Sequence, residues 1–212
     1  MTHPYWPLFD LRLRTPRLEL RVPTDDDFGP LLDAVDAGIH DPATMPFSFP
    51  WTDVEPVQRR RNAAQHWWRQ RAEWSPEKWN VPFAVTFEGQ VVGMQDVMAS
   101  DFPSLRTVET GSWLTQRVHG RGIGREMRSA VLHFAFDVLG AEVAKSGAFR
   151  DNPASLAVSR ALGYEDDGVD RAAPRGDVRE LVRLRLTRDK WQCAYDVTVE
   201  CAAECLPMFG LG

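Results

Sequence analysis

Three glycines at alternate positions, Gly120, Gly122 and Gly124, carry the clearest chemical signal in the chain. The segment before them (107–114) alternates like a strand, and the segment after them has apolar residues at helical spacing. Glycines between a strand and a helix let successive backbone N–H groups point at one place, where the helix dipole adds positive potential. The sequence therefore predicts a phosphate or pyrophosphate site, with a glycine-rich turn that merely starts a helix as the alternative.

Charge and spacing narrow the class of ligand. The net charge of −5 and the pI near 5.6 exclude bulk attraction to nucleic acid or an anionic membrane, so an anion must be held locally. The spacing differs from the G-x-G-x-x-G of dinucleotide folds and lacks the Gly-Lys-Ser/Thr ending of a P-loop. We therefore do not expect a dehydrogenase or a nucleotide-dependent kinase.

The elements that must position this loop predict an α+β fold with a mixed sheet. A hairpin is expected where Glu88-Gly89-Gln90 joins two strand-like runs. Segment 41–52 is too rich in proline for a regular element and is expected to form an aromatic loop. The tryptophans between 51 and 79 fit either an aromatic core with a lid or an aromatic substrate box. Strands are expected at 18–22, 83–87, 91–98, 107–114, 141–149 and 178–186, and helices at 25–37, 54–74, 123–139 and 153–162.

Length and cysteine content bound the class of protein. A chain of 212 residues buries a real core, and we expect one domain over 1–212. Three cysteines near the end, with no targeting segment before them, indicate reduced thiols in the cytoplasm and no metal site. No apolar run is long enough to cross a membrane.

The glycine loop and its surroundings resemble a known family. Arg117-x-x-Gly120-x-Gly122-x-Gly124 is similar to the pyrophosphate loop of the GNAT superfamily of acyl-CoA-dependent N-acyltransferases. Segments 15–18, 111–114, 151–155 and 161–164 resemble its RimJ/RimL-like branch, which includes ribosomal-protein N-terminal acetyltransferases. The resemblance covers about 10–190 and leaves 191–212 as a C-terminal extension. More narrowly, stretches such as 6–10 and 45–48 are similar to actinobacterial members that act as succinyl-CoA-dependent succinyltransferases.

This resemblance implies a GNAT fold, with a mixed sheet of six to seven strands, flanking helices and a splayed V between the two middle strands. It implies a coenzyme A thioester, acetyl-CoA or succinyl-CoA, as co-substrate without a metal, an amine as acceptor, and a homodimer or higher homo-oligomer. Asn152 before Pro153 is also a good helix N-cap, and the two roles are compatible. The residues implied to hold coenzyme A are Trp113, Leu114, Thr115, Arg117, Val118, His119, Gly120, Arg121, Gly122, Ile123, Gly124, Arg125, Asn152 and Ser155.

Catalytic roles follow from the same resemblance. Glu109 is the expected general base and Asp101 the reserve, although an exposed structural glutamate fits equally well. Ser159 stands where many members carry a tyrosine that protonates the leaving thiolate, and a serine is shorter and less acidic. Arg106 and Arg150 are candidates for holding a succinyl carboxylate. A module that binds acyl-CoA without turnover is the alternative function.

Overall fold

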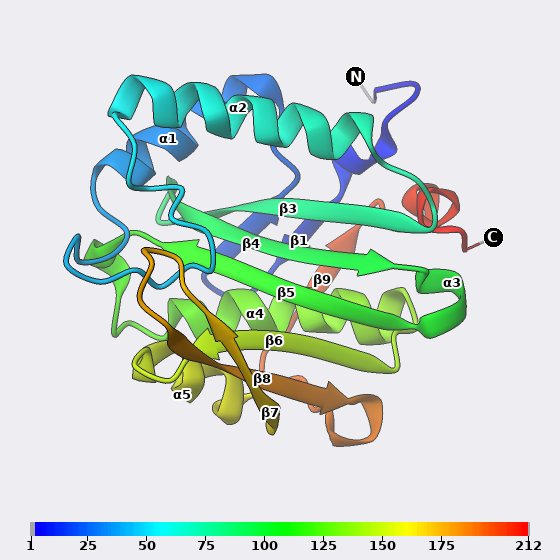
Figure 1. Cartoon of the computed structure of the whole chain (residues 1–212). Helices are drawn as coiled ribbons and strands as arrows, with labels where there is room; N and C mark the ends of the chain where they lie inside the picture. The colour runs from blue at the N-terminus through cyan, green and yellow to red at the C-terminus, as the bar shows by residue number, and fades with distance from the viewer. Residues whose placement is uncertain (1–2, 212) are drawn as a thin grey trace.

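The protein is described by a computed structural model of residues 3–211; Met1, Thr2 and Gly212 of the predicted 1–212 domain lie outside the described residues. Its centre is a mixed sheet in the order β7-β8-β6-β5-β4-β3-β2-β1-β9 (Figure 1). Among the described strands, β5 and β6 are the only parallel neighbours. The strands are β1 (Arg12–Arg14), β2 (Leu18–Arg21), β3 (Lys78–Phe87), β4 (Gln90–Ser100), β5 (Thr107–Leu114), β6 (Val143–Phe149), β7 (Glu165–Ala172), β8 (Arg179–Thr187) and β9 (Thr198–Glu200).

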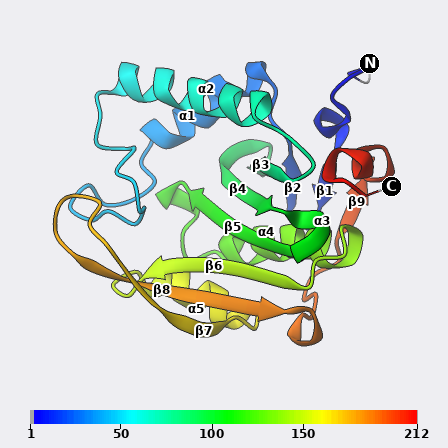
Figure 2. The same ribbon diagram turned by 45° about the vertical axis from the view of Figure 1, so that its right-hand side comes forward.

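Helices cover both faces of the sheet (Figures 1 and 2). α1 and α2 lie on one face, where Phe28 and Trp67 pack on Ala84 and Met94 of the central strands. α4 and α5 lie on the other face, and a single π-helical segment, Phe134–Val138, continues α4. The helices are α1 (Phe28–Asp36), α2 (Pro56–Ala72), α3 (Phe102–Leu105), α4 (Ile123–His133) and α5 (Pro153–Ala161).

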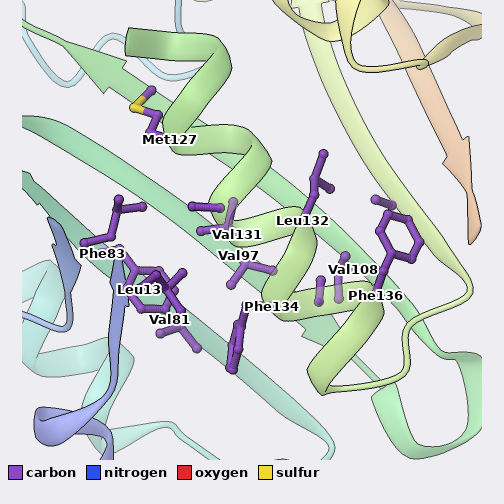
Figure 3. Close-up of a cluster of buried hydrophobic side chains, with 14 of the residues drawn as sticks. Leu13, Val81, Phe83, Val97, Val108, Met127, Val131, Leu132, Phe134 and Phe136 are labelled. Carbon is purple, nitrogen blue, oxygen red and sulfur yellow. The ribbon is translucent and has the colours of Figure 1, made fainter. Parts of the chain in front are cut away.

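The main core lies between α4 and the sheet (Figure 3). Met127 and Val131 of α4 and Phe134 of the π-helical segment that continues it recur at helical spacing, and they meet Phe83 and Val97 of the central strands. All five side chains are buried. Their burial explains the helical periodicity of the sequence and fixes α4 beneath the strand that leads into the glycine loop.

The sheet has nine strands where six to seven were expected. The α+β class, the hairpin at Glu88-Gly89 and the helices at the expected positions are confirmed. β7 escaped notice because it is polar and almost wholly exposed at the sheet edge, so it shows no apolar alternation. β1 and β9 have three residues each, which is too short for a periodic pattern.

The C-terminal extension completes the core. β9 pairs antiparallel with β1 and covers that edge of the sheet. In the following 3-10 segment, Ala203–Phe209, the Phe209 ring packs edge-on against Trp74, Trp79 and Phe134 at centroid distances of 5.5, 4.9 and 5.9 Å. Residues beyond the family resemblance therefore stabilise the domain. None of the helices within 3–211 is long and apolar enough to cross a bilayer.

Candidate active site

The parallel strands β5 and β6 part soon after they begin. Their backbone pairing runs from Thr107↔Val143 to Glu109↔Lys145 and then ends. Beyond that point β5 continues against β4 as far as Leu114, and β6 continues against β8. Each strand keeps its outer partner while the inner edges separate. The expected V between two middle strands is therefore confirmed, and its inner edges present backbone groups that an extended ligand can pair with.

The glycine loop joins the end of β5 to α4 at the open end of this V. Gly120 and Gly122 have φ of +73° and +78°, in the left-handed region that side chains other than glycine's rarely adopt. Gly122 is the N-cap of α4, and no side chain caps this helix. Among the described residues, no acceptor pairs with the backbone N–H groups of Ile123, Gly124 and Arg125. The predicted cradle of unpaired donors at a helix N-terminus is thus present.

A buried carboxylate fixes the loop from below. Glu126, 1% exposed, accepts hydrogen bonds from the Thr15 hydroxyl at 2.6 Å and from Arg17 Nε at 2.7 Å. Arg17 in turn donates from Nη1 to the carbonyl oxygen of Arg121, inside the loop, at 3.1 Å. The glycine loop is therefore held to the N-terminal segment through an ion pair that the sequence reading did not identify.

The other predicted loop residues divide into exposed and structural groups. Arg117 and Arg125 are exposed and make no ion pair among the described residues. Arg121 pairs with Glu88 at 3.2 Å. His119 Nε2 lies 3.0 Å from the Leu114 carbonyl oxygen. The side chains that are buried beneath the loop are Thr115, Val118 and Ile123, and those half-buried along the end of β5 are Trp113 and Leu114.

Asn152 begins α5 at the end of β6. Its Oδ1 accepts from the backbone N–H of Ser155 at 3.2 Å, and Pro153 occupies the first helical position, so the N-cap reading is confirmed. Asn152 and Ser155 are both half-buried. They therefore stand on the β6 side of the V, across from the glycine loop on the β5 side.

A polar cluster lies where α4 and α5 close the V from beneath. Ser159 is fully buried; its hydroxyl donates to the Ser155 carbonyl oxygen at 3.1 Å and accepts from Arg128 Nη1 at 2.7 Å. Arg128 Nη2 donates to the Ser112 hydroxyl at 3.1 Å, and Arg128 Nε has no partner among the described residues. Burial lowers the pKa of Arg128. Sequence reasoning missed this residue, although an arginine next to Met127 on an apolar helix was the available signal.

Two carboxylates lie on the opposite face of the sheet, the face on which α1 and α2 pack. Glu109 on β5 is exposed. Asp96 on the neighbouring strand β4 lies opposite Gly111, which is two residues after Glu109 on β5. Diagonal neighbours in such a ladder are roughly 7–8 Å apart. Asp96 Oδ1 is buried without a hydrogen-bond partner among residues 3–211, and burial raises the pKa of Asp96 to about 7. Asp96 was also missed, although an aspartate inside an apolar strand marked it.

Asp101 lies away from this site. It precedes α3 in a left-handed conformation and is exposed. α3 joins β4 to β5 at the end of β5 that is remote from the glycine loop (Figure 1). The structure therefore does not bring Asp101 to the open part of the V.

The proline-rich loop packs against β5 on the face that carries the two carboxylates. Trp51 contacts Trp113 at a centroid distance of 6.5 Å, and Phe47 contacts Trp51 at 5.2 Å. The loop is tied to the turn between β7 and β8 by Arg175 and Asp53 at 2.6 Å, and Figures 1 and 2 both show the two segments side by side. It forms one wall of that face. No cluster of three or more metal-ligating side chains occurs among the residues described.

Residues 17–165 match a family model described as an acetyltransferase (GNAT) domain. The chain belongs to the GNAT acetyltransferase family. The GNAT domain is also similar in structure to Mycobacterium smegmatis RimJ in complex with CoA-disulfide, with a TM-score of 0.72, 18% identity and coverage of 94% of each chain. RimL, a ribosomal L7/L12 alpha-N-protein acetyltransferase in complex with coenzyme A, gives a TM-score of 0.66 at 16% identity, over 82% of this chain and 95% of that one. Spermidine N-acetyltransferase from Vibrio cholerae, in complex with CoA and spermine, gives 0.65 at 15%, over 82% and 97%. At these identities the likeness concerns the GNAT fold.

Proposed function

We propose that this GNAT protein transfers an acyl group from a coenzyme A thioester to an amine. The proposal depends on one observation, which is that two structural features occur together at one end of the sheet. The inner edges of β5 and β6 separate after Glu109↔Lys145, and the unpaired N–H groups of the glycine loop stand at the open end. A pantetheine arm fits the gap as an added strand would, and a pyrophosphate fits the N–H groups.

The chemistry would take place near the apex of the V. The amine nitrogen attacks the thioester carbonyl carbon, a tetrahedral oxyanion forms, and the C–S bond breaks as its electron pair moves to sulfur. Glu109 is exposed on the strand that forms one arm of the V, which supports the role of base for the amine proton. Asp96 lies on the same face and is a second candidate for this role. Ser159 is buried with both hydrogen bonds occupied, which favours positioning over direct proton transfer.

The acceptor would approach on the face of the two carboxylates. The exposed carboxylate of Glu109 favours a cationic amine, such as a protein N-terminus, a lysine or a polyamine. The similar solved structures include enzymes described as acting on a ribosomal protein and on spermidine, which are amines of these kinds. The wall formed by the loop around Trp51 would exclude water from the thioester on this side.

Succinyl-CoA is our proposed donor, on the resemblance to succinyltransferases, with acetyl-CoA as the family's alternative. Of the two arginines considered for a succinyl carboxylate, Arg150 pairs with Glu180 on the surface, and Arg106 donates to the Leu139 carbonyl oxygen at 3.2 Å. Neither interaction is with a group of the V. Donor choice therefore needs a direct comparison of the two thioesters.

Turnover with both thioesters tests the proposal. The purified protein is incubated with acetyl-CoA or succinyl-CoA and with a basic peptide, lysine or spermidine, and acylated amine and free CoA are separated by chromatography. We expect one molecule of free CoA for each molecule of acylated amine. If Glu109 is the base, Glu109→Gln should lose at least tenfold in kcat. Glu73→Gln, at an exposed site after α2, is the matched control. Thioester binding with no product from any amine would instead support a binding module without turnover.

A further inference from the structure

Arg128 is a buried cation that forms no ion pair with any carboxylate among residues 3–211. The residue is 5% exposed, and its guanidinium donates hydrogen bonds to the neutral hydroxyls of Ser112 and Ser159. The other titratable group beside it is Tyr164, which is also buried and whose pKa is raised by burial. A buried charge is costly unless it is paired, and leaving one partner of a buried ion pair alone is strongly destabilising. The site is therefore suited to an anion that the protein itself does not supply.

The guanidinium lies just behind the gap between β5 and β6. Ser112, its partner on β5, is half-buried, and so is Ser146 on β6, whose hydroxyl lies 3.5 Å from the Thr110 carbonyl oxygen. These strands are no longer paired with each other at this level. The hydroxyls of Ser112 and Ser146 therefore flank the place where the backbones of β5 and β6 separate, and the Ser112 hydroxyl is in direct contact with Arg128.

The walls of the gap change character along its length. Near the glycine loop, a side chain on Gly124 would meet Leu114 and Val158 at 3.7 Å each, so this part of the wall is apolar. One helical turn further along α4, the wall consists of Ser112, Ser159 and the Arg128 guanidinium. A long thin ligand whose anionic head sits at the loop would therefore place its far end beside a positive charge.

We propose that Arg128 stabilises the coenzyme A thiolate as it leaves the tetrahedral intermediate. This inference rests on the acyltransferase function proposed above. When the C–S bond breaks, sulfur takes the electron pair, the amine proton goes to a base or to water, and Arg128 remains protonated throughout. The guanidinium acts by charge and hydrogen bonding, because arginine does not release its proton in proteins.

The side of the sheet on which Arg128 lies favours the thiolate over an acyl carboxylate. Arg128 belongs to α4, whereas Glu109 and Asp96 lie on the opposite face of the sheet, on which α1 and α2 pack. The acyl group must reach the amine on the carboxylate face. The sulfur and the arm that bears it then remain on the α4 side, next to Arg128.

Titration of bound coenzyme A tests this role. The ultraviolet absorbance of the thiolate is followed against pH in the complex with CoA, and the same complex with desulfo-CoA is subtracted to remove the protein's own cysteines and tyrosines. We expect the bound thiol to have a pKa about one unit or more below that of free CoA, a tenfold change in thiolate fraction. In Arg128→Met the pKa should return to that of free CoA or rise above it, and kcat should fall at least tenfold. Arg128→Lys should recover part of both.

Calorimetric binding of desulfo-CoA separates the possible failures. Binding by Arg128→Met with an unchanged thiol pKa would overturn the thiolate role and leave the acyltransferase proposal intact. A loss of rate confined to succinyl-CoA, with acetyl-CoA unaffected, would overturn it in favour of an acyl-carboxylate site. Failure of the unsubstituted protein to bind any CoA compound would overturn the proposed function itself. If Arg128→Met does not fold, Arg128→Lys and Ser112→Ala provide the same titration, and an unchanged pKa in both would refute the role.

Discussion

Replacing the carboxyl of Asp96 by an amide should stabilise the protein at alkaline pH. Asp96 sits half-buried in β4 with Oδ1 sealed from water and without a donor among the described residues. Burial disfavours the charged form and raises the pKa of Asp96 from the ordinary 3.8 to about 7. At pH 8 the Asp96 carboxyl is therefore ionised in both states, and its ionised form is less stable in the folded protein than in the water-exposed unfolded chain.

The sign and size of the effect follow from proton linkage. Between the unfolded and folded pKa values of Asp96 the native state binds more protons than the unfolded state, so the free energy of unfolding falls as pH rises. The contribution of Asp96 is fully present below about pH 4 and is lost as pH rises through about 7. A difference of about three pKa units at ~1.4 kcal/mol per unit sets a ceiling of about 4 kcal/mol at pH 8. Partial exposure of the residue and the unmet acceptor of the amide reduce the expected gain to about 2 kcal/mol.

Urea unfolding at several pH values measures this gain. We expect Asp96→Asn to exceed the unsubstituted protein by about 2 kcal/mol at pH 8, and the gap to shrink steadily toward pH 5. Asp177→Asn, in the exposed turn between β7 and β8, is the matched control. It should change neither the free energy of unfolding at pH 8 nor its dependence on pH. Parallel stability curves for Asp96→Asn and the unsubstituted protein from pH 5 to 8 would refute the reasoning.

Three further predictions concern the framework of the site. Gly93→Ala should destabilise the fold by about 3 kcal/mol in urea unfolding, because its Cβ would collide with the backbone and a side chain of β5. The control Gly29→Ala, whose Cβ would have nothing within 4 Å, should be neutral or gain about 0.5 kcal/mol. Equal effects of the two substitutions would contradict this prediction. Glu126→Gln should weaken CoA binding about tenfold in calorimetry and cost about 2 kcal/mol of stability, since it loosens the loop anchor, while the exposed control Glu88→Gln should cost less than 1 kcal/mol. Phe209→Ala should cost about 3–5 kcal/mol in the same unfolding assay if the C-terminal extension is part of the core, and a loss below 1 kcal/mol would show that it is not.

The sequence predicts the glycine loop and the start of α5 because local rules control both. Gly120 and Gly122 adopt positive φ, and Asn152 before Pro153 caps its helix, as short-range preferences require. Periodicity likewise predicts the main helices and the strands at 83–87, 91–98 and 107–114. These features depend on neighbours within a few residues, so they can be read from one chain.

The parts that escaped prediction depend on contacts between distant residues. Arg17 and Glu126 are 109 positions apart, and only the fold shows that they form the anchor of the loop. Arg128 and Asp96 read as ordinary polar residues until the packing shows that each holds a buried polar atom without a hydrogen-bond partner among the described residues. The role of 198–209 in closing the sheet edge and the core was invisible for the same reason.

Calorimetric binding of acetyl-CoA, succinyl-CoA and CoA, to the protein and to Gly122→Glu, tests the central claim most directly. Glutamate at Gly122 would strain a left-handed position and put a negative charge where the unpaired N–H groups converge. Gly176→Glu has the same left-handed backbone, with open space around it in the β7–β8 turn, and serves as the matched control. We predict that the unsubstituted protein and Gly176→Glu bind the CoA compounds alike and that Gly122→Glu loses at least a hundredfold in affinity. Equal binding by Gly122→Glu, or no binding by the unsubstituted protein, would contradict the account.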